Sequence, residues 1–239
     1  MTSAPVSRQL PLDLPHRPHF SRADFLVADA NHAALAALDR FGERSGAALA
    51  ISGPPGSGKT HLAHIWASRT GARWIRPETL SQALPELASL PPAALVFDAA
   101  DQVAGNAEAE TGLFHLLNLV RQQGGSLLLS GRQAPSRWNV ALPDLRSRLS
   151  ALETVAVGAP DEALLGAVLV KLFADRQVSL GGEVIAYLLP RMDRSLDSAR
   201  ELVGRIDAES LAGKRPITVP LAAKVLAALQ ETKDSSEGE

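Results

Sequence analysis

The stretch from Gly53 to Thr60, GPPGSGKT, constrains the fold of this chain more than any other part of the sequence. It matches the pattern G-x-x-x-x-G-K-[ST] completely, with an apolar run at 47–52 before it and a helical pattern at 59–70 after it. A glycine-rich turn between a strand and a helix lets backbone N–H groups and the helix N-terminus face phosphate oxygens. The stretch therefore predicts a nucleotide phosphate site, with a chance glycine-rich turn as the alternative.

The residues of this stretch have expected roles in binding ATP or ADP. Lys59 supplies a positive charge to the β- and γ-phosphate oxygens, and the Thr60 hydroxyl reaches Mg²⁺. An apolar run, Ala94–Phe97, leads directly into Asp98, whose carboxylate we expect beside the same ion. The sequence therefore predicts a Mg²⁺ site at Thr60 and Asp98. The expected nucleotide contacts along the loop are Gly53, Pro54, Pro55, Gly56, Ser57, Gly58, Lys59 and Thr60.

Apolar runs alternate with helical patterns from Asn31 to Val157, which is typical of a parallel sheet covered by helices on both faces. After Pro160 the pattern changes to four helices, expected at 162–176, 182–191, 196–211 and 219–229. We therefore expect an α/β domain with a five-stranded parallel sheet, followed by a small all-α domain. The expected divisions are an arm at 1–22, the α/β domain at 23–159, the helical domain at 160–230 and a disordered acidic tail at 231–239.

Composition excludes several classes of protein. Cysteine is absent, which excludes disulfides, thiol nucleophiles and cysteine-ligated metal sites. The net charge of −2 argues against a strongly basic nucleic-acid-binding domain. The longest stretch without a charged residue, Ser45–Gly58, is too short and too rich in glycine and proline for a membrane span. We therefore expect neither a membrane segment nor, from the first residues, a secretory signal.

Four short segments resemble the bacterial replication initiator DnaA and its relatives, which are AAA+ ATPases. Residues 58–64, GKTHLAH, are similar to the family's G-K-T-H-L-x-H, and residues 25–31, FLVADAN, to its adenine-side segment F-V-x-G-x-x-N. Residues 144–149, DLRSRL, resemble its box VII, and residues 198–202, SAREL, resemble its sensor 2 motif. The resemblance spans Phe25 to about Leu229 and implies an AAA+ domain followed by a helical lid.

The resemblance also implies roles for single residues. Arg148 would be an arginine finger that acts in trans on ATP bound to a neighbouring subunit, with an ordinary surface ion pair as the alternative. Arg200 would contact the phosphates of the chain's own nucleotide, with an ion pair along its helix as the alternative. Arg146 is a weaker candidate for the same interface. The remaining residues implied to lie along the nucleotide are Leu26, Val27 and His61, and those in the sensor 1 region are Ser130 and Arg132.

Two positions, Ala28 and Ala99, depart from the family pattern, and the role of a third, Asp101, has two interpretations. Ala28 replaces the glycine of the adenine-side segment. Ala99 stands where AAA+ ATPases usually carry a second acid that activates water, so we expect weak intrinsic ATP hydrolysis. Asp101 is either a replacement for that acid or a solvated or capping residue. His61 and His64 are spaced like metal ligands, but no third ligand is evident and helix packing or capping is favoured.

The N-terminal arm contains QLPLDL at 9–14, which resembles the hexapeptide Q-L-x-L-x-L with which bacterial proteins bind the DNA polymerase sliding clamp. Gln9 would form a hydrogen bond at the rim of the clamp cleft, and Leu10, Leu12 and Leu14 would be apolar anchors. An arm packed on its own domain is the alternative. Initiators also carry a helix-turn-helix domain after the lid, whereas this sequence ends soon after the fourth expected helix, so we do not expect origin recognition.

A short initiator-like AAA+ chain with a clamp-binding arm resembles the Hda family, the regulatory inactivators of DnaA. This resemblance implies a protein of the bacterial cytoplasm that sits, bound to ADP, on a DNA-loaded clamp. It would stimulate hydrolysis of DnaA-bound ATP and so prevent re-initiation. The implied partners are the clamp, DnaA and, through the clamp, DNA, while a second copy of this chain is another neighbour for the finger. The alternatives are a loader or adaptor of the replicative helicase, a self-sufficient ATPase and a nucleotide-dependent scaffold.

Overall fold

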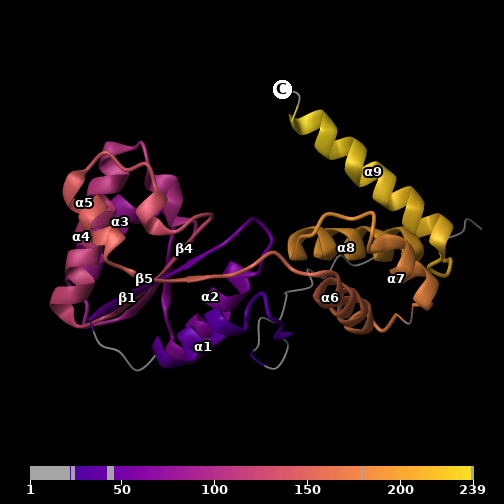
Figure 1. The fold of residues 1–239 in the computed structure, drawn as a ribbon, viewed down its shortest axis with the longest axis horizontal. Helices are drawn as coiled ribbons and strands as arrows, with labels where there is room; N and C mark the ends of the chain where they lie inside the picture. Colours follow the sequence, from indigo (N-terminus) through magenta and orange to yellow (C-terminus); the bar gives the residue numbers. More distant parts are fainter. Residues whose placement is uncertain (1–21, 23–24, 42–45, 179, 238–239) are drawn as a thin grey trace, which may run out of the picture.

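The computed structural model of this chain describes residues 22, 25–41, 46–178 and 180–237, with side chains as far as Thr232. Figure 1 shows an α/β domain and a helical domain, residues 162–237, which we call the lid. An extended segment after the last strand joins the two domains. Among the described helices, none is long and apolar enough to cross a membrane.

The α/β domain is built on a five-stranded sheet in which every pair of neighbouring strands is parallel. The strand order is β2-β3-β4-β1-β5, so β1, which precedes the glycine-rich loop, lies inside the sheet. This arrangement confirms the predicted parallel sheet of five strands. The strands are β1 (Ala47–Ser52), β2 (Arg73–Ile75), β3 (Ala94–Phe97), β4 (Ser126–Gly131) and β5 (Glu153–Ala156).

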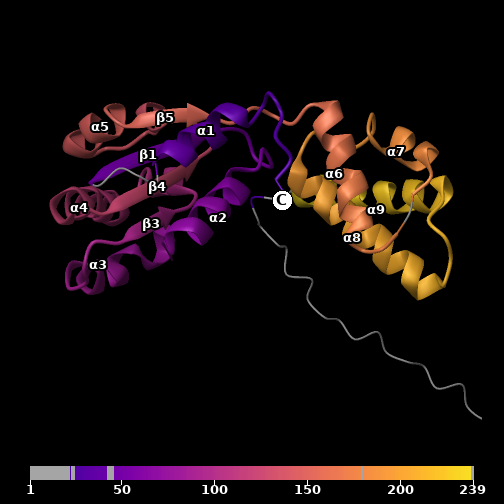
Figure 2. The same cartoon turned by 90° about the horizontal axis from the view of Figure 1, so that it is seen from below.

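Helices cover both faces of the sheet because successive strand side chains point to opposite sides. Leu127 and Leu129 of β4 pack with one set of helices, whereas Leu128 between them packs with the other. Figure 2 shows α1 and α2 on one side of the sheet and α3, α4 and α5 on the other. These helices are α1 (His32–Phe41), α2 (Lys59–Thr70), α3 (Leu80–Ala88), α4 (Ala107–Gln123) and α5 (Pro143–Ser150), and the short 3₁₀ helices are η1 (Pro77–Thr79), η2 (Ala100–Val103) and η3 (Pro135–Arg137).

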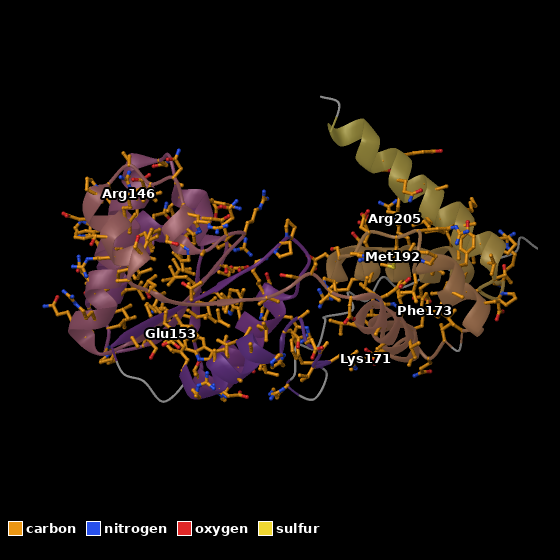
Figure 3. All side chains as sticks on the ribbon, viewed as in Figure 1. Arg146, Glu153, Lys171, Phe173, Met192 and Arg205 are labelled. Carbon is orange, nitrogen blue, oxygen red and sulfur yellow. The ribbon has the colours of Figure 1, made fainter. Side chains whose placement is uncertain are left out.

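The lid is all-α over its described residues and has its own apolar core, to which Phe173 and Met192 contribute (Figure 3). The side chain of Asp161 caps the first lid helix by accepting a hydrogen bond from Leu164 N–H, and Ser195 caps the third in the same way. The predicted small helical domain is therefore confirmed. Its helices are α6 (Glu162–Ala174), α7 (Gly182–Leu188), α8 (Leu196–Gly213) and α9 (Val219–Glu237).

The C-terminal end differs from the expectation. A helix ending at Leu229 and a disordered tail at 231–239 were predicted, but α9 continues to Glu237. No glycine or proline occurs between Pro220 and Gly238, so the polar residues after Leu229 extend the helix without a breaker. The helix thus ends later than expected, while the expected disorder of the tail at 231–239 stays a prediction.

Candidate nucleotide-binding site

The glycine-rich loop, residues 53–60, here called the phosphate loop, connects β1 to the first turn of α2. Gly56 and Gly58 have φ angles of +67° and +98°, in the left-handed region that favours glycine. Among the described residues no side chain caps the N-terminus of α2, which starts at Lys59. The first N–H groups of any α-helix lack an intrahelical partner, and the N-cap of α2, Gly58, has no side chain to bond them, so they can face a phosphate.

Two glycines of the phosphate loop lie where no side chain fits. A Cβ atom at Gly53 would collide with the carbonyl oxygen of Val157, which follows β5. A Cβ atom at Gly56 would collide with the side chain of Ser195 in the lid. The loop is thus held closely between the end of the sheet and the lid, and its backbone forms a cradle of the kind that a nucleotide phosphate fits.

Lys59 bends back over the loop, where its Nζ atom donates hydrogen bonds to the carbonyl oxygens of Gly53 and Pro54, both at 2.8 Å. Burial lowers the pKa of Lys59, and the nearby carboxylates of Asp98 and Asp101 partly oppose that lowering. The ammonium group is therefore held at the cradle by backbone oxygens and lies within electrostatic reach of the acidic residues at the ends of neighbouring elements.

Thr60 and Asp98 meet at the carboxyl end of β3, as predicted for a Mg²⁺ site. The Thr60 hydroxyl donates a hydrogen bond of 3.2 Å to one oxygen of Asp98, and Ser130 at the end of β4 donates to the other. Within the described residues no cluster of three or more His, Cys, Asp or Glu side chains forms a metal site. One hydroxyl and one carboxylate suit Mg²⁺ bound together with nucleotide phosphates and waters, rather than a cage made by the protein alone.

Ala99 and Asp101, the two residues after Asp98 that matter for hydrolysis, form hydrogen bonds with Ser130 of β4 and with Arg132, which follows β4. Ala99 has a left-handed φ of +52°, and its N–H donates to Ser130 Oγ at 2.9 Å. A carboxylate oxygen of Asp101 accepts a hydrogen bond of 3.2 Å from the backbone N–H of Arg132. Asp101 therefore lies beside the sensor 1 region, and its charge opposes the lowering of the pKa of Lys59 by burial. Its catalytic role stays a prediction.

The adenine-side segment is fixed by one buried amide. Asn31 is 2% exposed and accepts a hydrogen bond from Ala28 N–H while donating one to the Leu26 carbonyl, both at 3.0 Å. Ala28 is absent from the described non-glycine residues with positive φ, so alanine replaces the family's glycine there without a left-handed strain. Leu26 is half-buried and Val27 is 55% exposed, so part of this apolar surface is accessible, and its contact with a base stays a prediction.

The two histidines of α2 pack against aromatic rings. His61 makes an edge-on contact with Phe25, with ring centroids 5.1 Å apart, and His64 lies 4.3 Å from the exposed ring of Trp74. Burial lowers the pKa of His64, and Asp98 partly opposes this. The packing interpretation of these histidines therefore agrees with the structure, and His61 also links the adenine-side segment to the lid through Arg200.

Arg200 projects from α8 to the same site. Its guanidinium lies 3.4 Å from Nδ1 of His61 and forms an ion pair of 3.0 Å with Asp197, one turn earlier on its helix. The backbone N–H of Leu196 donates a hydrogen bond of 2.8 Å to the carbonyl of Gly56. The first turn of α8 is thus docked directly on the phosphate loop. The ion pair of Arg200 along its helix is present, whereas its contact with nucleotide phosphates stays a prediction.

Arg148 does not lie beside Arg200 but packs against α4. Its guanidinium carbon is 5.0 Å from the centroid of the Phe114 ring on α4. In both ribbon views α5, which carries Arg148, is on the side of the sheet away from the lid, and Figure 3 shows Arg146 of α5 there. Arg146 donates a hydrogen bond of 2.6 Å to the Val140 carbonyl. The structure therefore does not bring Arg148 to the lid side of its own phosphate loop, where Arg200 lies.

Glu110 was missed by the sequence reasoning. Its carboxylate is 1% exposed and accepts hydrogen bonds from the N–H groups of Gly105, Ala141 and Leu142 at 2.9 to 3.1 Å. Burial alone would raise the pKa of Glu110, but these bonds and the charge of Arg146 outweigh burial and lower it. The helical period of the sequence indicated that Glu110 is buried, because Glu110 falls on the face of α4 that also buries Leu113 and Leu117.

The predicted clamp-binding residues lie outside the described part of the chain. Gln9, Leu10, Leu12 and Leu14 all precede Arg22, the first described residue. Their role stays a prediction from the sequence.

Comparisons with known proteins agree with this geometry. Residues 165–226 match the protein family described as "Hda, lid domain". An uncharacterized protein of Haemophilus influenzae is 31% identical over 184 residues, which cover 74% of this chain and 80% of that protein.

Solved structures have the same fold. Domain III of the replication initiation protein DnaA from Thermotoga maritima superposes with a TM-score of 0.78 at 19% identity, covering 89% of this chain and 97% of that one. AMPPCP-bound DnaA from Aquifex aeolicus gives a TM-score of 0.67 at 21% identity, covering 82% and 68%. With the Hda lid and the Haemophilus relative, this likeness shows that the chain belongs to the Hda/DnaA-related AAA+ proteins.

Proposed function

We propose that this protein regulates initiation of chromosome replication by stimulating hydrolysis of ATP bound to DnaA. In this proposal it acts while bound to the DNA-loaded sliding clamp and carries ADP in its own site. The Hda lid and the DnaA-like fold together support a DnaA-related replication regulator. The finer statement, that it acts through the clamp and an arginine finger, is our proposal.

The observation that carries the proposal is the position of Arg148. It is on α5, on the side of the sheet away from the lid, and its guanidinium packs over Phe114. An arginine in this position is suited to act on a nucleotide held by a neighbouring molecule. Its planar, permanently charged group would stabilise the charge that develops on the transferred phosphoryl group in the partner's site.

The chain's own site would hold the nucleotide through residues already described. The phosphate loop and Lys59 would bind the phosphates, and Leu26, Val27 and the ring of His61 would contact the base side. Thr60 and Asp98 would hold Mg²⁺, which neutralises phosphate charge when bound. The AMPPCP bound to the Aquifex DnaA supports a nucleotide in a site of this fold.

Slow hydrolysis in the chain's own site is part of the proposal. Ala99 provides no carboxylate beside Asp98, and the Asp101 carboxylate is engaged by the backbone of Arg132. A protein that works in its ADP form needs no rapid turnover. Fast basal hydrolysis by the purified chain, lost in Asp101→Ala, would show instead that Asp101 replaces the missing acid.

The arm would supply the clamp contact. Gln9 would bond at the cleft rim while Leu10, Leu12 and Leu14 fill it, and DNA would be reached through the clamp. The neighbour that receives Arg148 would be DnaA, and a second copy of this chain is the competing neighbour.

The test follows labelled ATP preloaded on DnaA in the presence of this protein, ADP, sliding clamp and primed DNA. We expect hydrolysis to accelerate in the complete mixture and to return to the DnaA rate when the clamp is omitted. A chain that leaves the ATP intact in the complete mixture, and instead binds the replicative helicase, would be a helicase loader or adaptor. That outcome would overturn the proposal.

A further inference from the structure

The first turn of α8 and the phosphate loop form one contact surface. Leu196 N–H donates to the Gly56 carbonyl at 2.8 Å, and Cδ1 of Leu196 lies 3.1 Å from the position that a Cβ of Gly58 would occupy. The side chain of Ser195 occupies the space where Gly56 has no Cβ. Residues of the first turn of α8 are thus fixed relative to the loop backbone, including those that make no direct contact with it.

Asp197 is carried by this turn and brings a negative charge to the cradle. Its side chain is 73% exposed and forms an ion pair of 3.0 Å with Arg200, whose guanidinium is 31% exposed. The Asp197 carboxylate also acts on Lys59, where it opposes the lowering of the lysine pKa by burial. Asp197 therefore engages Arg200 and lies within electrostatic range of Lys59, the two cations expected to face the phosphates.

This arrangement has opposite consequences for the two nucleotides. A triphosphate carries about one more negative charge than a diphosphate near neutral pH, and that charge is on the terminal phosphate. A carboxylate near the cradle repels the additional charge, and its ion pair with Arg200 competes for the cation that would bind it. The diphosphate meets less of this repulsion and makes less use of Arg200.

We propose that Asp197 sets the nucleotide preference of this site by disfavouring a γ-phosphate, so that the chain holds a nucleoside diphosphate more readily than a triphosphate. The inference rests on the proposed function, because it requires a nucleotide in the phosphate loop. It adds a residue that selects between ADP and ATP, and it provides a reason for the chain to remain in its ADP form.

The test measures binding of fluorescent ADP and ATP, each with Mg²⁺, to the full-length wild type and to Asp197→Asn. Asparagine keeps the size of aspartate at this first-turn position but removes the charge. Glu201→Gln is the matched control, since Glu201 is an exposed acid of the same helix that pairs with Arg205 away from the loop. Asp197→Ser is a second neutral variant, and thermal unfolding of each protein verifies that it is folded.

We expect Asp197→Asn and Asp197→Ser to shift the ratio of the two dissociation constants toward ATP by about three- to tenfold, with Glu201→Gln close to the wild type. The shift should shrink at about 0.5 M salt, because an exposed charge is screened there. If the wild type binds both nucleotides and both Asp197 variants keep its ratio, the inference is wrong while the nucleotide site stands. If the folded wild type binds neither nucleotide, the proposed function fails with it.

Discussion

The hydroxyl of Thr60 lies 3.2 Å from a carboxylate oxygen of Asp98, although 38 residues separate them along the chain. Ser130 holds the second oxygen of the same carboxylate. Asp98 is thereby oriented from two sides, by the first turn of α2 and by the end of β4. This relationship is the basis for our proposal that the site binds a nucleotide together with Mg²⁺.

Asp98→Asn should weaken nucleotide binding in the presence of Mg²⁺ but not in its absence. The amide keeps the size of the side chain but loses the charge that a hard divalent cation requires. We expect at least about a tenfold loss of affinity, about 1.4 kcal/mol, in Mg²⁺ and little change in EDTA. Titration of a fluorescent nucleotide under both conditions measures this, with Asp144→Asn on α5 as an exposed control. An equal loss with and without Mg²⁺ would contradict the assignment.

Gly56→Ala should disturb the contact between the phosphate loop and the lid. Alanine would have to adopt a φ of +67° and its Cβ would collide with Ser195. Gly105→Ala is the matched control, because Gly105 has a φ of +87° but no heavy atom within 4 Å of the place that a Cβ would occupy. We expect the control to lose about 1 kcal/mol of unfolding free energy from backbone strain alone.

Gly56→Ala should lose more than this control and should also bind nucleotide more weakly. Urea unfolding and nucleotide titration measure the two effects. If the two variants have equal free energies of unfolding and both bind nucleotide with the affinity of the wild type, the loop and the lid are not coupled through Gly56 and Ser195.

Glu110→Gln should destabilise the α/β domain in a pH-dependent way. The pKa of Glu110 is lowered in the folded state because backbone hydrogen bonds from Leu142, Gly105 and Ala141 outweigh burial. The carboxylate therefore stabilises the fold above the pKa of an unfolded glutamate, about 4.3, and this contribution disappears as the pH falls through the lowered value.

We expect Glu110→Gln to cost about 2 kcal/mol at pH 7 and the difference from the wild type to shrink below about pH 4. Urea unfolding at several pH values measures this. Glu108→Gln, an exposed acid in the same turn of α4, is the control and should be close to neutral. A constant difference down to pH 3 would show that the charge of Glu110 is not what stabilises the fold.

Replacing Gln9 and Leu10 together by alanine should abolish clamp binding without changing the thermal unfolding temperature. The substitutions remove the expected rim hydrogen bond and one apolar anchor of the arm. Surface plasmon resonance with immobilised clamp measures binding, with His16→Ala in the same arm as control. Unchanged affinity of the double variant would remove the arm from the account.

Local sequence patterns predicted the parts of the fold that depend on neighbours along the chain. The apolar runs predicted β1 and β3 with their observed ends, and the loop pattern predicted the start of α2 at Lys59. The meeting of Thr60 with Asp98 also followed, because the carboxyl ends of all strands of a parallel sheet lie at the same edge, and β1 and β3 are separated there only by β4.

Contacts between distant segments did not follow from such patterns. The contact of Arg200 with His61 spans 139 residues, and the hydrogen bond from Leu142 N–H to Glu110 spans 32. Each of these contacts depends on how two elements that are distant in the sequence pack against one another. Neither the hydrophobic periodicity of a segment nor a short motif specifies that packing. The contact of Arg148 with Phe114 was unpredicted for the same reason.

The central claim is that Arg148 acts on ATP held by DnaA, and a single-turnover measurement tests it most directly. DnaA preloaded with labelled ATP is mixed with clamp, primed DNA, ADP and either the wild type, Arg148→Ala or the control Arg205→Ala, whose exposed arginine is on the lid (Figure 3). We predict that the wild type and Arg205→Ala accelerate hydrolysis, whereas Arg148→Ala, with clamp binding intact, loses at least about a hundredfold of the stimulation. Acceleration by Arg148→Ala equal to that of the wild type would contradict the claim.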